Sequence, residues 1–210
     1  MLLADIINNS DEFYSGNLRH YFKCLFSARG ANNPFHNIRH SLDVLIKCYD
    51  GLLFYKDRII DKSARRALLI AAIFHDFGHT GRSGNDDVNI ILALRGFDKH
   101  ILPEDTGIRE MVRTLIGSTE YGPAGHVKLN NTLLSQILKD ADLSQVCSQA
   151  WIRLVIFGLA EEMQTTPESI LRMQESFLSK TKFYTDWARQ KFDLNEKIEE
   201  ARQLIAILDS

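Results

Sequence analysis

The sequence contains little proline, little cysteine and no long apolar run. Of its 210 residues, 4 are proline and 3 are cysteine. Cys24, Cys48 and Cys147 stand singly, so they form neither the CxxC spacing of a zinc or redox motif nor a disulfide framework. The longest apolar run, residues 67–74, is too short to cross a bilayer, and Asp5 interrupts the N-terminus before a signal sequence can form. These absences predict a soluble, cytoplasmic protein without a membrane anchor.

An excess of charge of either sign is also missing. The chain has 25 Lys and Arg against 27 Asp and Glu, a formal net charge of -2. A basic surface for nucleic acid is therefore not expected. No repeat, low-complexity tract or Pro/Gly-rich linker divides the sequence, so we expect one compact domain over residues 1–210. The composition leaves the oligomeric state open.

What the sequence does contain is helical periodicity. Apolar residues recur at spacings of three and four, and no segment alternates convincingly with period two. Thr166 and Pro167 have the residue types favoured at a helix N-cap and at the first helical position. We therefore predict an all-α fold of about nine or ten helices. The clearest segments are residues 13–26, 40–54, 64–74, 108–116, 132–138, 145–163, 166–177 and 195–208.

Three short segments combine histidine and carboxylate side chains with apolar helices. His36 and His40 are four residues apart, a spacing that places both imidazoles on one face of a helix. His75 and Asp76 follow the most apolar predicted helix, and Asp142 ends another. Burying such charges is costly unless they are paired, and a divalent cation would neutralise two carboxylates held beside neutral imidazoles. Mixed nitrogen and oxygen donors suit Zn²⁺, Mn²⁺ or Fe²⁺ better than Ca²⁺.

The order of these residues matches a known pattern. His40, then His75 and Asp76, then Asp142 resembles the H…HD…D pattern of the HD superfamily of metal-dependent phosphohydrolases. The surrounding residues are most similar to the class I cyclic-nucleotide phosphodiesterases. The resemblance rests on residues 35–44 (FHNIRHSLDV), 71–81 (AAIFHDFGHTG), 115–120 (LIGSTE) and 141–144 (ADLS). Gly78 stands where that family has a second acid, and the chain is shorter than the family's usual catalytic domain.

The resemblance implies a metal centre. His40, His75, Asp76 and Asp142 would ligate a tightly bound Zn²⁺, Mn²⁺ or Fe²⁺. Asp76 would also bridge to a second ion, which has few protein donors and is therefore expected to be weakly bound Mg²⁺ or Mn²⁺.

The resemblance also implies roles around this centre. His36 would be the general acid that protonates the leaving oxygen. His79 would orient the bridging hydroxide or bind the second ion, and Glu120 would hold a metal-bound water or one of the ligand imidazoles. Gln174 and Phe177 would bind the nucleobase by hydrogen bonding and stacking, although Phe177 also fits the apolar stripe of its own helix.

The expected activity is hydrolysis of a 3′,5′-cyclic nucleotide, a small-molecule substrate. Three alternatives stay open. The first is another HD phosphohydrolase, such as a nucleotidase or an alarmone hydrolase. The second is an HD-type diiron oxygenase, which needs further histidines from among His79, His100 and His126. The third is a module that binds a nucleotide without turnover.

Overall fold

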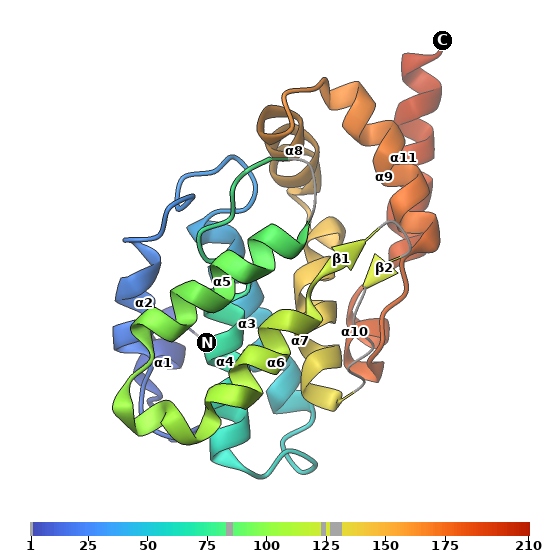
Figure 1. The fold of residues 1–210 in the computed structure, drawn as a ribbon. Helices are drawn as coiled ribbons and strands as arrows, with labels where there is room; N and C mark the ends of the chain where they lie inside the picture. Colours follow the sequence, from blue (N-terminus) through green and yellow to red (C-terminus); the bar gives the residue numbers. More distant parts are fainter. Residues whose placement is uncertain (1, 83–85, 123–124, 127–131) are drawn as a thin grey trace.

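The computed structural model describes residues 2–82, 86–122, 125–126 and 132–210. Helices form nearly all of its regular structure, which confirms the predicted all-α class (Figure 1). Within the described residues there are eleven α-helices, slightly more than expected, and one antiparallel pair of two-residue strands, β1 (Tyr121–Gly122) and β2 (Gly125–His126). The α-helices are α1 (Leu3–Asn8), α2 (Arg19–Leu25), α3 (Ile38–Phe54), α4 (Lys62–Phe74), α5 (Asp86–His100), α6 (Arg109–Ser118), α7 (Leu133–Leu143), α8 (Gly158–Glu162), α9 (Pro167–Lys180), α10 (Asp186–Lys191) and α11 (Leu194–Leu208).

Helix α4 is the centre of the larger hydrophobic core. Every side chain in residues 67–74 is fully buried, as expected for a helix that is apolar on all sides. Helices α3 and α6 pack directly against α4, and α7 packs against both α3 and α4. Because His75 and Asp76 follow the last turn of α4, the path of this buried helix fixes where they lie.

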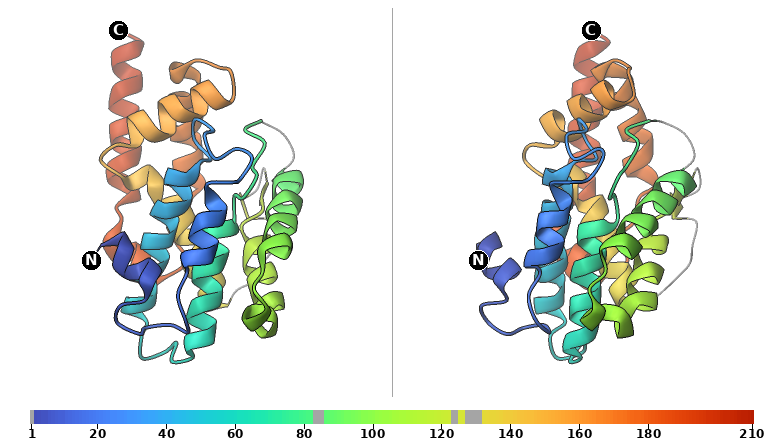
Figure 2. Two further views of the ribbon diagram at one scale, coloured as in Figure 1. Left: turned by 90° about the vertical axis from the view of Figure 1, so that its left-hand side faces the viewer. Right: turned by 60° about the vertical axis from the view of Figure 1, so that its left-hand side comes forward.

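A second cluster of buried apolar residues lies toward the C-terminus. It is built from residues of the short helices η2 (Ser144–Cys147) and η3 (Ile152–Phe157) and of α8, α9 and α11, and it includes Trp151, Ile170 and Ala201. Helices α9 and α11 lie side by side, and the end of α11 projects away from the rest of the molecule (Figures 1 and 2). The single domain over residues 1–210 stays a prediction.

Several helix starts follow the capping signals in the sequence. Thr166 accepts the backbone N–H of Ser169, and Pro167 occupies the first position of α9, as predicted. Thr132 caps α7 in the same way, and Asp61 caps α4 through the N–H of Ser63. These local contacts begin two of the helices that carry site residues.

The prediction of one continuous helix over residues 145–163 is wrong. The segment is divided into the 3₁₀ helix η2 (Ser144–Cys147), a bend, the π-helical η3 (Ile152–Phe157) and α8. Among the described residues no single helix is long and apolar enough to cross a membrane. One bent pair, Leu133–Cys147 with Ile152–Glu162, meets that criterion by length and composition alone, with a 100° break between its halves. Beyond the break, α8 brings Glu162 next to His36.

Candidate active site

The structure brings the four predicted metal ligands together. His40 Nε2 lies 3.2 Å from His75 Nε2 and 3.2 Å from Asp76 Oδ2, and His75 Nε2 lies 3.3 Å from Asp76 Oδ2. Asp142 Oδ1 lies 3.0 Å from His40 Nε2 and 3.6 Å from His75 Nε2. His40 Nε2, His75 Nε2 and Asp76 Oδ2 thus form a nearly equilateral triangle, and Asp142 Oδ1 lies beside its two nitrogen corners.

These separations fit a single transition-metal ion. Such an ion binds imidazole nitrogen and carboxylate oxygen at about 2.0–2.2 Å, so adjacent donors of one ion lie about 3–3.5 Å apart. The imidazoles are almost completely buried, whereas the Asp76 and Asp142 side chains are 17% and 24% exposed. The group is therefore closed on its histidine side and open to the cavity on its carboxylate side. His40, His75 and Asp76 lie close enough together to hold a metal ion.

The two imidazoles are oriented by hydrogen bonds on their far nitrogens. His75 Nδ1 donates to the backbone oxygen of Ala72 at 2.9 Å, because a carbonyl can only accept. His40 Nδ1 donates to Gln145 Oε1 at 2.5 Å. Each ring therefore directs Nε2 toward the carboxylates, which is the arrangement that outer partners of ligating histidines produce in metal sites.

The charges within this group stabilise one another. Burial lowers the pKa of His40, but hydrogen bonds to Asp142 and Asp76 outweigh it and raise the pKa to about 9. The pKa of His75 is raised well above its ordinary value by the same carboxylates, against the effect of burial. Burial raises the pKa of Asp76 and Asp142, but the two imidazoles hold both values below the ordinary one. The carboxylates thus favour positive charge at this position, either as protons or as a cation.

His36 reaches the site by a different route from the one predicted. Helix α3 begins at Ile38, because Asn37 is extended and its side chain caps the helix by accepting the N–H of His40. His36 therefore precedes the helix, and the expectation that it shares a helix face with His40 is wrong. Its ring centroid nevertheless lies 6.0 Å from that of His40.

Glu162, at the end of α8, holds His36 in place. His36 Nδ1 lies 2.5 Å from Glu162 Oε1, and Glu162 Oε2 accepts the backbone N–H groups of Phe35 and His36 at 2.9 and 3.0 Å. Burial raises the pKa of Glu162, but the hydrogen bond from His36 outweighs it and leaves the value lowered. An ionised carboxylate therefore fixes Nδ1 as a protonated nitrogen and leaves Nε2 for a substrate.

His79 stacks against His36, with ring centroids 3.7 Å apart and an interplanar angle of 22°. Burial and the nearby charge of His36 lower the pKa of His79 to about 4, so this ring is neutral at pH 7. Its Nδ1 accepts the backbone N–H of Gly81 at 3.1 Å. The turn that places His79 needs left-handed backbone at Gly78 (φ +78°) and Gly81 (φ +67°), which glycine adopts readily.

A cavity of about 370 Å³ adjoins these groups. Its described lining includes Asp86, whose Oδ2 accepts the Tyr121 backbone N–H at 2.7 Å. Burial raises the pKa of Asp86, and the charge of Asp76 raises it further. The lining residues are His36, Asp76, His79, Arg82, Asp86, Asn89, Ile90, Thr119, Tyr121, Asp142, Leu159, Glu162 and Met163.

The remaining predicted residues lie outside that lining. Glu120 lies between two residues that do line the cavity, Thr119 and Tyr121. Gln174 is buried in α9, and its Oε1 has no hydrogen-bond partner among the residues that the structure describes. The Phe177 ring centroid lies 5.7 Å from that of Tyr121, which lines the cavity. The roles assigned to these three residues stay predictions.

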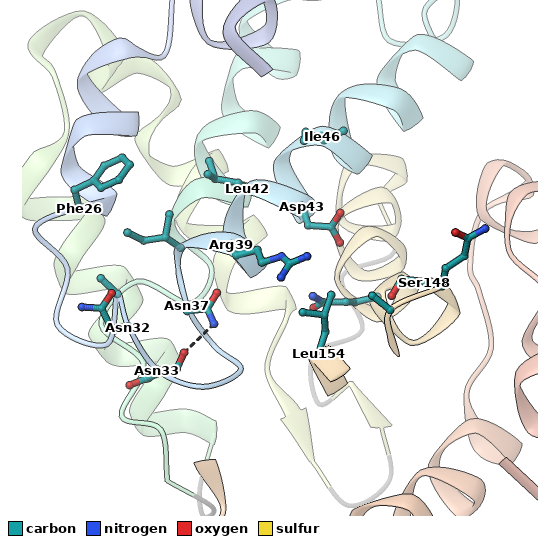
Figure 3. Close-up of a pocket in the computed structure, with 15 residues that line it drawn as sticks. Phe26, Asn32, Asn33, Asn37, Arg39, Leu42, Asp43, Ile46, Ser148 and Leu154 are labelled. Carbon is teal, nitrogen blue, oxygen red and sulfur yellow. Dashed lines mark hydrogen bonds between the residues drawn. The ribbon is translucent and has the colours of Figure 1, made fainter. Parts of the chain in front are cut away.

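A larger hollow of about 970 Å³ lies on another side of α3 (Figure 3). Arg39 and Asp43 reach into it from α3, and Leu154 faces them from η3. It shares Gln145 with the site, but none of its described lining residues is a predicted metal ligand or His36. The chemistry is concentrated in the smaller cavity, so we place the candidate active site there.

Residues 35–94 match the family model described as 3′5′-cyclic nucleotide phosphodiesterase. The predicted resemblance is confirmed. This segment contains His36, His40, His75, Asp76 and His79, so it supplies most of the site.

Individual relatives agree with the family match. The chain is 33% identical over 96 residues to a mouse (Mus musculus) protein, the high affinity cAMP-specific and IBMX-insensitive 3′,5′-cyclic phosphodiesterase 8A, and 34% identical over 96 residues to the human (Homo sapiens) protein of that name. Each alignment covers 44% of this chain and 11% of the relative. The cGMP-specific 3′,5′-cyclic phosphodiesterase delta of Plasmodium falciparum is 34% identical over 85 residues, which cover 39% of this chain and 10% of that protein. The chain thus matches about a tenth of the length of these curated relatives.

Three residues at the site were not predicted from the sequence. Glu162 is separated from His36 by 126 residues, and Gln145 from His40 by 105. Neither lies in a segment whose pattern indicates a site. Arg82 lines the cavity directly after the motif that ends at Gly81, and its position there was a usable signal.

Proposed function

We propose that this chain is a metal-dependent phosphohydrolase that converts a 3′,5′-cyclic nucleotide into a nucleoside 5′-monophosphate. The observation that carries the proposal is one cavity lined both by the carboxylates of the His40, His75, Asp76 and Asp142 cluster and by an imidazole held by a carboxylate, His36. The similarity of residues 35–94 to cyclic nucleotide phosphodiesterases supports the substrate class. The substrate would be a small molecule rather than a polymer.

In this proposal the donor cluster holds one ion tightly. Two carboxylates and two imidazoles suit Zn²⁺, Mn²⁺ or Fe²⁺. A second, mostly hydrated Mg²⁺ or Mn²⁺ would bind on the cavity side of Asp76, where Asp86 adds another carboxylate. When bound, such ions lower the pKa of a water molecule and neutralise phosphate charge.

His36 supplies the proton that the reaction requires. Hydrolysis joins a water-derived oxygen to phosphorus and breaks one P–O ester bond, so the departing sugar oxygen must gain a proton. Glu162 accepts Nδ1–H of His36, so the ring acts as the acid in its doubly protonated form, in which Nε2–H donates to that oxygen and leaves a neutral imidazole. Such general-acid catalysis contributes roughly 10²–10⁴ in rate. Arg82, which also lines the cavity, would add a cation for the phosphate oxygens.

A nucleotidase of the same superfamily is the second candidate. It is favoured by the position of Gln174 and Phe177. Residues that bind a nucleobase would line the cavity, and these two do not. The diiron alternative has less support, because His100 lies with His20 and Cys24 rather than beside the donor cluster. Of the extra histidines whose side chains the structure describes, His79 alone lies in the cavity.

Turnover of defined nucleotides tests the proposal. The purified chain is stripped with a chelator, reloaded with Mn²⁺, Zn²⁺ or Mg²⁺, and incubated with cAMP, cGMP, 5′-AMP and 5′-GMP while products are separated by chromatography. We expect a cyclic nucleotide to give its 5′-monophosphate. His36→Gln should lower kcat by roughly 10²–10⁴ while bound metal is unchanged. Release of phosphate from the monophosphates alone would indicate a nucleotidase, and no turnover of any of the four would overturn both proposals.

A further inference from the structure

A second group of metal-ligating side chains lies outside the candidate active site. His20 and Cys24 are four residues apart on α2, and His100 is the last residue of α5. One donor atom from each of the three residues lies within 4.8 Å of the others. None of the three lines the cavity that contains His36 and Asp76. The group has no role in the proposed hydrolysis.

The separation within the group suits a tetrahedral ion. Cys24 Sγ lies 3.7 Å from His20 Nε2. Zinc binds thiolate sulfur at about 2.3 Å and imidazole nitrogen at about 2.0–2.1 Å, so two such ligands of one tetrahedral ion lie about 3.6 Å apart. The i,i+4 spacing on α2 keeps these two side chains on one helix face. The two residues are thus placed as a pair of ligands before any ion binds.

The surroundings allow an ion to enter and then hold it. Cys24 is 7% exposed, whereas His20 and His100 are half-buried, so the sulfur lies at the inner end and the imidazoles lie at the rim. Aromatic rings flank the two imidazoles: His20 lies 5.2 Å from the Tyr21 ring, and His100 lies 5.7 Å from the Phe77 ring, centroid to centroid. Burial of the sulfur beside such apolar groups strengthens the attraction between a thiolate and a cation.

One existing contact must change for an ion to bind. His20 Nε2 lies 2.8 Å from the backbone oxygen of His100 and donates a hydrogen bond to it. Coordination through Nε2 replaces this hydrogen bond and moves the ring proton to Nδ1. Burial raises the pKa of the Cys24 thiol, so the thiol is protonated without a metal and releases one proton when the ion binds. The same two helices are joined before and after binding, first by the hydrogen bond and then by the ion.

We propose that His20, Cys24 and His100 form a second metal site, selective for a thiophilic ion such as Zn²⁺, that clamps α2 to the C-terminal end of α5. The donor set is one thiolate and two imidazoles, with a position left for water. The centre at His40 and Asp76 offers no sulfur, so the two sites differ in the ions that they prefer. Helix α5 begins at Asp86, which lines the active cavity, so occupancy of the second site would stabilise the helix that carries this carboxylate.

Cobalt(II) is the sharpest probe, because a thiolate-to-cobalt charge-transfer band requires a cysteine ligand. The reduced, chelator-treated protein is titrated with Co²⁺, and the bound cobalt is then displaced with Zn²⁺. We expect an intensity that corresponds to one thiolate-bound cobalt per chain, beside any cobalt bound at His40, His75, Asp76 and Asp142, and we expect Zn²⁺ to abolish the band. Asp142→Asn, which removes a carboxylate from the other centre, should keep the band. The proposal is therefore separable from the proposed hydrolytic function.

Matched cysteine variants complete the test. Cys24→Ser should lose the band, whereas Cys147→Ser, which changes a thiol outside the group, should keep it. His20→Gln and His100→Gln should weaken cobalt binding by more than the roughly 10–100-fold cost of losing an outer-shell partner. These two variants also decide the matter if Cys24→Ser does not fold, with circular dichroism as the check on folding. A missing band in the wild-type protein, or a band that persists in Cys24→Ser, would overturn the proposal.

Discussion

Glu162 offers the most specific test of the site, because its carboxylate serves His36 and nothing in the metal cluster. Its two oxygens receive three hydrogen bonds, one from the His36 ring and two from the backbone N–H groups of Phe35 and His36. The side chain is 3% exposed. In Glu162→Gln the amide oxygen can still accept the two backbone N–H groups, but the amide nitrogen cannot accept Nδ1–H. The substitution therefore removes one charge-assisted hydrogen bond and leaves a ring proton without an acceptor.

The expected magnitudes follow from that loss. A hydrogen bond to a charged group contributes about 1.5–3 kcal/mol, so Glu162→Gln should destabilise the protein by an amount of this order. If the transition state for proton transfer loses the same stabilisation, this free energy corresponds to a decrease in kcat of roughly 10–100-fold. His36→Gln removes the acid itself and should lower kcat further, by roughly 10²–10⁴-fold. The double variant should be no slower than His36→Gln, because both changes act on one proton.

The assay pairs cyclic-nucleotide turnover with metal content and thermal unfolding. Glu161→Gln is the matched control, because it neutralises the adjacent carboxylate, which is exposed, and should leave kcat unchanged. Bound metal should be the same in Glu162→Gln and wild type, since Glu162 holds His36 rather than an ion. A variant with wild-type kcat would refute the positioning role. Loss of metal on this substitution would instead make Glu162 a ligand, together with His36 and His79.

Four further predictions concern the metal centre. Metal affinity should increase as the pH rises toward about 9, because an ion must displace the proton on His40, whose pKa is raised to about 9. Isothermal titration calorimetry at several pH values measures this dependence. In the metal-free protein the same group should contribute stability that is complete below pH 6.5, the ordinary value, and that is lost as pH rises through about 9, measurable by urea unfolding. Gln145→Leu should weaken metal binding roughly 10–100-fold by removing the acceptor for His40 Nδ1–H, and unchanged affinity would contradict that role. Gly96→Ala should lower both Tm and metal affinity, because a Cβ would lie 2.2 Å from the Phe77 ring beside Asp76, whereas Gly107→Ala, with nothing within 4 Å, should lower neither.

The parts of the fold that the sequence predicts are those set by local rules. The uninterrupted apolar residues of α4 and the Thr166–Pro167 start of α9 were both predictable, because one depends on burial and the other on capping. The bend after η2 was not, since no proline or glycine in residues 145–157 marks it. The start of α3 was misjudged for a related reason. Asn37 is a strong N-cap, and its preference for that position outweighed the apparent i,i+4 pairing of His36 with His40.

The candidate site likewise has one part that the sequence predicts and one part that it does not. The four donors lie within or directly after helices whose paths are fixed by apolar burial, so a motif of local spacing could identify them. Their outer partners come from elsewhere, because a hydrogen-bond acceptor for an imidazole can be supplied by any segment that the fold brings near. Gln145 and Glu162 have this role, from η2 and α8. In the proposed function, the bend that separates these two elements lets one side of the break orient a proposed metal ligand, His40, and the other orient the proposed proton donor, His36. A substitution that straightened residues 148–157 would therefore impair metal binding and proton transfer together, whereas Gln145→Leu and Glu162→Gln should separate the two effects.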